Sequence, residues 1–196
     1  MPGNYENVNV TEQIINQKPT SNIEQNFYDY FPEFESLLIR KMNLYKIEFE
    51  IEPYLSVPLI TPKYVLKIIR NDFGDVFRNY NIFDCRSVEE YEMGHVVGAS
   101  LMSERAARKK FTLAGSNSIL IFYCEFSSKR CKQIISIIQK VNTKGIREGK
   151  SLLYPNLAII EGGYCNFYKQ YPHYCDPRGY LTEQEAYRNY LMKNKF

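Results

Sequence analysis

Short apolar runs and amphipathic stretches alternate along the chain from residue 61 onward. The apolar runs predict buried strands, and apolar side chains at helical spacing predict the helices that cover them. Because strands that alternate with helices usually pair in parallel, this order predicts an α/β fold with helices on both faces of the sheet. The predicted strands are residues 81–85, 96–101, 118–123 and 157–160, and the predicted helices are residues 62–69, 89–93, 105–110, 131–141, 164–169 and 183–192.

The first 60 residues lack this alternation. Residues 1–35 are rich in Asn, Gln, Glu and Ser, which indicates a flexible segment, although its aromatic part is a candidate for packing on the domain. Residues 44–60 contain two prolines and predict extended segments. We therefore expect an acidic, partly flexible N-terminal leader over residues 1–43. A single domain that includes the C-terminal helix then follows over residues 44–196.

The formal net charge of +3 conceals two parts of opposite sign. Residues 1–60 carry four basic and nine acidic side chains, a net charge of −5. Residues 61–196 carry 21 basic and 13 acidic side chains, a net charge of +8. Because acids are interspersed among the bases, this pattern favours a local anionic partner such as a phosphate, and we expect no binding to nucleic acid.

Composition excludes several other classes of protein. No run approaches the roughly 18 apolar residues of a membrane span, so we expect no membrane association. The first residues lack the basic and apolar regions of a secretory signal. The five cysteines and two histidines show no metal-site spacing. We therefore expect no metal and no cofactor, and reduced thiols in the nucleus or cytoplasm, where a cysteine is free to act as a nucleophile.

One segment places a cysteine and an arginine at the two ends of a loop. Cys124 ends a predicted strand, and Arg130 begins an amphipathic helix six positions later. Ligands of parallel α/β sheets bind at the carboxyl ends of the strands, where this loop lies. The segment is therefore a candidate phosphate-binding loop. Its residues are Glu125, Phe126, Ser127, Ser128, Lys129 and Arg130.

The loop has the residue types that phosphoryl chemistry needs. A curled loop at a helix start directs backbone N–H groups at an anion, and an arginine clamps two phosphate oxygens at once. The same positive field favours the thiolate of Cys124. The residues predict attack of Cys124 on phosphorus and hydrolysis of the cysteinyl-phosphate by water, without a metal. The alternative is that Cys124 is a small buried hydrophobe in an ordinary loop.

This loop resembles that of the M-phase inducer phosphatases, the dual-specificity cell-division-cycle phosphatases that activate cyclin-dependent kinases. Their signature H-C-E-F-S-S-E-R corresponds to Y-C-E-F-S-S-K-R at residues 123–130, and similarity extends from about residue 60 to about residue 190. The other segments that match in order are I-F-D-C-R at 82–86, E-Y-E at 90–92, G-H-V at 94–96, Y-P at 154–155, G-G-Y at 162–164 and Y-C-D-P at 174–177.

The resemblance implies a rhodanese-like domain with a five-stranded parallel sheet between helices. It implies that the partner is a phosphorylated cyclin-dependent kinase–cyclin complex, which a monomeric enzyme would dephosphorylate and activate at mitotic entry. Cys124 would be the nucleophile, Arg130 the phosphate clamp and Glu125 the proton donor. Cys85 matches a second family cysteine, a redox partner that forms a protective disulfide with the catalytic thiolate.

Three residues depart from the family pattern. Tyr123 replaces a histidine that helps to order the loop and to lower the thiol pKa, and its hydroxyl is a candidate substitute. Lys129 replaces a glutamate, which removes one candidate proton donor and adds positive charge. Cys131 follows Arg130 in place of glycine and brings a third cysteine close to the nucleophile.

Other polar residues have structural interpretations beside functional ones. Asp84 and Arg86 predict a buried ionic network with Glu90 and His95. Glu125 points either at the substrate oxygen or at solvent and a neighbouring lysine. One set of basic side chains forms either a docking surface for an acidic kinase face or a solvated helix face: Lys109, Lys110, Lys132, Lys140, Lys144 and Arg147.

Two further functions stay open beside the phosphatase. A sulfurtransferase or arsenate reductase of the same fold would use the same cysteine, although its loop sequence would differ from E-F-S-S. A catalytically weakened module, disabled by Tyr123 and Lys129, would bind a kinase without dephosphorylating it. The retained Cys124 and Arg130 favour the enzyme.

Overall fold

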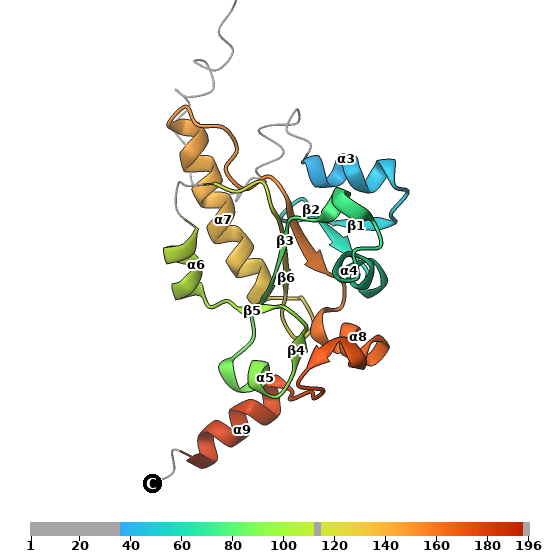
Figure 1. Ribbon diagram of the computed structural model, residues 1–196. Helices are drawn as coiled ribbons and strands as arrows, with labels where there is room; N and C mark the ends of the chain where they lie inside the picture. The colour runs from blue at the N-terminus through green and yellow to red at the C-terminus, as the bar shows by residue number, and fades with distance from the viewer. Residues whose placement is uncertain (1–35, 112–114, 194–196) are drawn as a thin grey trace, which may run out of the picture.

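A six-stranded sheet forms the centre of the computed structural model, which describes residues 36–111 and 115–193 (Figure 1). Its strand order is β1-β2-β7-β6-β3-β5. The five strands from β2 to β5 pair in parallel, which confirms the predicted sheet. The strands are β1 (Phe49–Glu52), β2 (Val57–Ile60), β3 (Tyr80–Asp84), β5 (Ser100–Leu101), β6 (Ile119–Tyr123) and β7 (Leu157–Ile160).

The sixth strand, β1, is an addition to the predicted five. It pairs antiparallel with β2, with Phe49 opposite Ile60. Only four residues separate the two strands, and so short a connection permits an antiparallel hairpin but not a parallel crossover. The proline-containing segment that was expected to be extended therefore forms the edge of the sheet.

Helices cover both faces of this sheet, as predicted. Figure 1 shows α6 and α7 on one side and α3, α4 and α8 on the other. The α-helices are α3 (Leu37–Leu44), α4 (Pro62–Ile69), α5 (Val88–Glu92), α6 (Glu104–Lys110), α7 (Arg130–Arg147), α8 (Gly163–Gln170) and α9 (Glu183–Lys193), and two 3₁₀ turns are η1 (Gly74–Phe77) and η2 (Pro172–Tyr174).

The central strand β6 divides the core into two apolar clusters. Ile121 and Tyr123 belong to the cluster under α3, α4 and α8, whereas Leu120 and Phe122 belong to the cluster under α6 and α7. Successive side chains of a strand point to opposite faces, so a run that is apolar throughout is suited to a strand covered on both sides. The alternation also directs Cys124 to the α7 side of the sheet.

The predicted strand over residues 96–101 is wrong. The chain forms two separate strands there, β4 (His95–Val96) and β5, on either side of a turn. Gly98 has a φ of +77°, a left-handed conformation that breaks a strand. Whereas β5 pairs with β3, β4 pairs antiparallel with β8 (Cys175–Asp176) in a second, two-stranded sheet.

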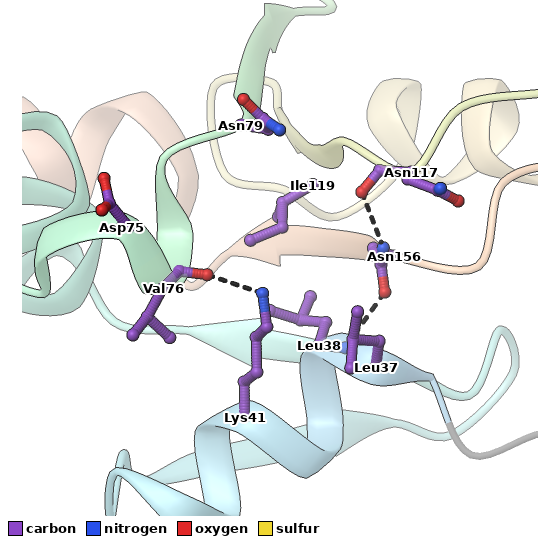
Figure 2. Close-up of a pocket in the computed structure, with 9 residues that line it drawn as sticks. All are labelled: Leu37, Leu38, Lys41, Asp75, Val76, Asn79, Asn117, Ile119 and Asn156. Carbon is purple, nitrogen blue, oxygen red and sulfur yellow. Dashed lines mark hydrogen bonds between the residues drawn. The ribbon is translucent and has the colours of Figure 1, made fainter.

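Helix α3 lies across the expected boundary between leader and domain at residues 43 and 44. Leu38 and Met42 are each 1% exposed and belong to the core under α4 and α8. Figure 2 shows how α3 is fastened: the Leu38 N–H donates to Asn156 Oδ1 at 3.0 Å, and Lys41 Nζ donates to the Val76 carbonyl at 2.7 Å. These contacts surround a small polar cavity of about 70 Å³. Residues 37–43 thus pack on the domain, and residues 1–35 lie outside the described residues.

The carboxyl ends of β3, β6 and β7 meet at one edge of the sheet, because the three strands are parallel neighbours. The segments that leave this edge lead into α5, α7 and α8. Helices α5 and α9 contact each other beyond it (Figure 1). The fold therefore brings three connections and the C-terminal helix together around the loop after β6.

Replacing Leu38 by alanine tests whether α3 is part of the domain. Loss of a fully buried leucine side chain is expected to lower the free energy of unfolding by about 2–5 kcal/mol. Leu37, which is 51% exposed, is the matched control, and Leu37→Ala is expected to change stability by less than about 0.5 kcal/mol. Urea denaturation measures both. Equal, small effects would mean that α3 contributes nothing to the core.

Candidate active site at the loop after β6

The loop from Cys124 to Arg130 has the predicted position. Cys124 directly follows β6 and is 2% exposed, and Arg130 is the first residue of α7. Between them, Ser127 has a φ of +55°, so the chain turns sharply through a left-handed residue. Loop and helix start together form the curled connection that an anion cradle requires.

Helix α8 holds the carbonyl groups of this loop. The Tyr164 N–H donates to the Cys124 carbonyl at 2.9 Å, and the Cys165 N–H donates to the Glu125 carbonyl at 3.0 Å. In a trans peptide the N–H points opposite to the C=O. The next N–H groups in the loop are therefore directed away from α8, on the side where an anion would bind.

Gly163 makes this contact possible. A Cβ atom at this position would lie 2.4 Å from the Cys124 carbonyl oxygen and 2.7 Å from the Ser127 nitrogen. Its φ of +65° also favours glycine. The G-G-Y segment is thus the backbone surface against which the loop is seated.

Cys124 is held as a thiolate. A side-chain hydrogen bond from Cys131 lowers the pKa of Cys124 most, whereas burial raises that pKa. The backbone N–H groups of Cys131 and Lys129 and the charge of Arg130 lower it further. Together they lower the pKa of Cys124 to about 5, against roughly 8.5 for a free cysteine. Cys124 is therefore ionised at neutral pH, although Tyr123 stands where the M-phase inducer phosphatases have histidine.

Arg130 is oriented by a carboxylate that the sequence assigned elsewhere. Its Nη1 and Nη2 donate to Glu90 Oε2 at 2.5 Å and Oε1 at 3.0 Å, and the Glu90 side chain is 1% exposed. Such a two-pronged pair fixes the plane of the guanidinium. Glu90 also accepts from the Ser87 N–H in a capping box of α5. The sequence around Glu90 indicates only this capping box at the start of α5, and it does not predict the ion pair with Arg130.

The predicted network of Asp84, Arg86, Glu90 and His95 is therefore only partly correct. Asp84 and Arg86 form a fully buried ion pair at 2.6 Å, and Arg86 also donates to the Gly94 carbonyl at 2.6 Å. Glu90 pairs with Arg130 instead. His95 stacks on the Tyr91 ring, and its Nδ1 lies 2.9 Å from the Tyr91 carbonyl oxygen.

Tyr123 faces the other side of the sheet from Cys124. Its ring is fully buried in the core under α8, and its hydroxyl accepts a hydrogen bond from the Val96 N–H at 3.1 Å. Burial, and next the charge of Asp84, raise the pKa of this hydroxyl well above its usual value. Tyr123 thus anchors β4 as a neutral side chain.

Glu125 points neither at solvent nor at a lysine. The residue is 4% exposed; Oε1 accepts from the Tyr180 hydroxyl at 2.7 Å, and Oε2 accepts from the Glu183 N–H at 3.1 Å. The carboxylate thus anchors the start of α9 beside the loop. Its role as a proton donor stays a prediction.

The remaining loop residues differ in exposure. Phe126, Ser128 and Lys129 are exposed, whereas the Ser127 side chain is buried beside Cys131. A groove of about 630 Å³ lies beside Phe126. Its wall is completed by Glu125, Thr182, Glu183, Gln184 and Tyr187.

Glu183, at the start of α9, forms an ion pair with Arg130. Its Oε2 lies 3.3 Å from Arg130 Nη2, and its side chain is 65% exposed. The sequence did not predict this contact, because Glu183 and Arg130 are far apart in the chain and no local pattern links them. An exposed carboxylate thus occupies part of the positive field that a phosphate would use.

Two cysteines lie near Cys124. The Cys131 sulfur is 3.9 Å from the Cys124 sulfur, whereas the Cys85 sulfur lies 3.9 Å from the Phe83 carbonyl oxygen. A disulfide between Cys85 and Cys124 stays a prediction.

The parts of the chain that the structure describes contain no group of three or more His, Cys, Asp and Glu side chains arranged to hold a metal ion. Within the same residues, no helix is both long and apolar enough to cross a membrane.

Residues 61–170 match the family model of a rhodanese-like domain. The chain is 34% identical over 142 residues to M-phase inducer phosphatase 2 of Mus musculus, covering 67% of this chain and 24% of that protein. It is 32% identical over 143 residues to M-phase inducer phosphatase 1-B of Xenopus laevis, covering 68% and 26%. The chain thus spans about a quarter of the length of these relatives. Among solved structures, an As-Sb reductase from Leishmania major has a TM-score of 0.47 at 20% identity, over 68% of this chain and 97% of that chain.

Replacing Gly163 by alanine tests the seat of the loop. The methyl group would displace the Cys124 carbonyl, which should add roughly 1–3 kcal/mol of destabilisation to the left-handed strain of about 1–2 kcal/mol. Gly149→Ala is the matched control, because Gly149 has a similar φ of +73° and open space around its Cα. Urea denaturation gives stability, and the alkylation rate of Cys124 reports the thiolate. If both variants behave alike, the close approach of Gly163 does not order the loop.

Proposed function

This chain belongs to the rhodanese-like domain family, and we propose that it is a metal-independent phosphatase of phosphotyrosine and phosphothreonine. One observation carries the proposal. A cysteine whose pKa is lowered to about 5 and an arginine oriented by a buried carboxylate stand at the two ends of one loop. Thiolate and guanidinium are the nucleophile and the charge clamp that attack on a phosphate monoester requires.

The reaction would proceed in two displacements. The Cys124 thiolate attacks phosphorus, the bond from phosphorus to the substrate oxygen breaks, and that oxygen leaves with a proton. Water then attacks the cysteinyl-phosphate, which releases inorganic phosphate and restores the thiolate. The inward N–H groups of the loop and the Arg130 guanidinium bind the phosphoryl oxygens, on which charge builds in both transition states. The Ser127 hydroxyl, which is buried beside Cys131, is a further candidate donor for this group.

Glu125 is the proposed proton donor. Glu125 directly follows the proposed nucleophile and is one of the residues that line the groove. To reach the leaving oxygen, its carboxyl group must exchange its bonds to the Tyr180 hydroxyl and the Glu183 N–H for one to the substrate. The start of α9 would therefore move when substrate binds.

The proposed substrate is a cyclin-dependent kinase in complex with its cyclin, phosphorylated on adjacent threonine and tyrosine. The names of the relatives support a role at mitotic entry. The proposed location is the nucleus or cytoplasm, where the cysteines would stay reduced. An open groove beside the exposed Phe126 is suited to a side chain presented by a folded protein. The basic residues of α7, which include Lys140 and Lys144, are candidates for the docking surface.

The decisive test is release of phosphate from a doubly phosphorylated kinase–cyclin complex and from an aryl phosphate. Cys124→Ser is expected to abolish turnover while retaining binding, because a serine hydroxyl is not ionised at neutral pH. Arg130→Lys should lower kcat/KM on the order of 10²–10³-fold, since lysine cannot hold two oxygens in one plane. Arg78→Lys, at an arginine whose side chain is 75% exposed, is the matched control and should keep full activity.

Three outcomes would contradict this proposal. Equal turnover by wild type and Cys124→Ser would remove the nucleophile from the reaction. Cyanide sulfuration or arsenate reduction far above phosphatase activity would favour another chemistry of this fold. Binding of the complex by a wild-type chain that releases no phosphate would favour a kinase-binding module.

Glu183→Gln tests the charge opposite the clamp. Removing a carboxylate 3.3 Å from Arg130 should lower KM for an aryl phosphate about 1.5- to 5-fold, the range expected for an exposed ion pair, with little change in kcat. The difference should shrink as ionic strength rises. Glu185→Gln is the control of equal charge, because glutamine still serves the capping box with Thr182. A fall in KM that both variants share would indicate a general charge effect.

A further inference from the structure

Two sulfur atoms face each other at the base of the loop. Cys124 Sγ and Cys131 Sγ lie 3.9 Å apart, one at the end of β6 and the other at the second residue of α7. Both residues are buried in the cluster under α7, at 2% and 0% exposure. A sulfur–sulfur contact in an apolar cluster brings together the two groups that thiol chemistry needs.

We propose that Cys131 is a second functional thiol of this site, which donates a hydrogen bond to the Cys124 thiolate and closes a disulfide with it when a peroxide oxidises Cys124. The first role deepens the proposed phosphatase function, and the second does not depend on it. The sequence placed the redox partner at Cys85 by resemblance, but the sulfur in contact with Cys124 is that of Cys131.

The charges around the pair assign the proton to Cys131. The hydrogen bond to Cys124, burial and the negative charge of that thiolate raise the pKa of Cys131. The same bond, with Arg130 of α7 nearby, lowers the pKa of Cys124. Ser127 of the loop forms a side-chain hydrogen bond with Cys131 that opposes the rise in the pKa of Cys131. Cys85, the residue after β3, adds to that rise, and burial raises the pKa of Cys85 itself well above its usual value. Cys124 is therefore the thiolate, and Cys131 is the donor.

Oxidation of Cys124 would turn Cys131 from a hydrogen-bond donor into the attacking sulfur. The Cys124 thiolate attacks one peroxide oxygen, the O–O bond breaks, and hydroxide leaves and takes up a proton, so that Cys124 becomes a sulfenic acid. The negative charge that kept the proton on Cys131 is then gone. The Cys131 sulfur attacks the Cys124 sulfur, the S–O bond breaks, and hydroxide leaves as water with the Cys131 proton. Two thiols have supplied the two electrons that the peroxide accepts.

The geometry favours Cys131 over Cys85 as the first partner. A disulfide is about 2.05 Å long, so the two sulfurs must approach by about 1.9 Å, a movement within the reach of side-chain rotation. The Cys85 sulfur lies against the Phe83 carbonyl on its own strand. Closure would remove both the nucleophile and its donor, and a dithiol reductant would restore them.

Disulfide mapping tests the redox role on the full chain. Reduced protein is treated with hydrogen peroxide, free thiols are blocked, and tryptic peptides are analysed without reduction. Trypsin cuts after Lys129 and Arg130, so the predicted bond joins two peptides. Wild type and Cys85→Ser should both yield the link from Cys124 to Cys131, and Cys131→Ser should yield none. A first-formed link from Cys124 to Cys85 in wild type, or over-oxidation of Cys124 without any link, would overturn the proposal.

Alkylation of Cys124 by iodoacetamide as a function of pH tests the donor role. Cys131→Ala removes the donor and should move the midpoint of the alkylation rate upward by about one pH unit or more. Cys131→Ser keeps a donor of similar size and should move it less. Urea denaturation checks that each variant is folded. If a variant does not fold, disulfide mapping of the wild-type chain still tests the redox role. Equal midpoints for wild type and Cys131→Ala would overturn this role.

Neither measurement uses phosphatase turnover, so the two proposals fail separately. If the link forms and the midpoint moves while no phosphate is released from any substrate, Cys131 keeps its role and the phosphatase proposal fails. If phosphate release depends on Cys124 but no disulfide from Cys124 to Cys131 forms, the phosphatase proposal stands and the redox role of Cys131 fails.

Discussion

Two hydrogen bonds from the start of α8 to the carbonyl groups of Cys124 and Glu125 are the constraint on which the site depends. They occupy the acceptors of the loop, so that the donors of its peptide groups face the other way. The contact requires a residue without Cβ at Gly163, at the end of the connection from β7. Two neighbouring parallel strands thus form the site together: β6 leads to Cys124, and β7 leads to the segment that orients its loop.

Around this backbone, charge is balanced by contacts that come from distant parts of the chain. Arg130 is shared between the buried Glu90, which fixes its plane, and the exposed Glu183, which a phosphate can displace. Glu125 ties α9 to the loop through Tyr180 and a backbone N–H. The guanidinium therefore has one buried partner and one exposed partner, an arrangement that is suited to the proposed binding and release of a phosphate.

The sequence predicted those features that contiguous residues encode. The apolar run ending at Cys124 predicted a buried strand, because a strand between two covered faces needs no polar positions. It predicted the loop and the start of α7 for the same local reason. It failed at residues 96–101, where Gly98 turns the chain and β4 pairs with β8, almost 80 residues away. It also could not reveal that α3 is part of the core, because a short amphipathic stretch alone does not show which surface it packs against.

By itself, the sequence determined the alternation of strands and helices after residue 61 and the position of Cys124 and Arg130 at the ends of one loop, whereas the count of five parallel strands came from the family resemblance. Only the tertiary structure decided which carboxylate holds Arg130, where Glu125 points, and that Cys131 is the thiol in contact with Cys124. The physical reason is distance along the chain. Backbone hydrogen bonding and local periodicity follow from neighbouring residues, whereas a side chain's partner depends on packing between elements that meet only in the folded domain.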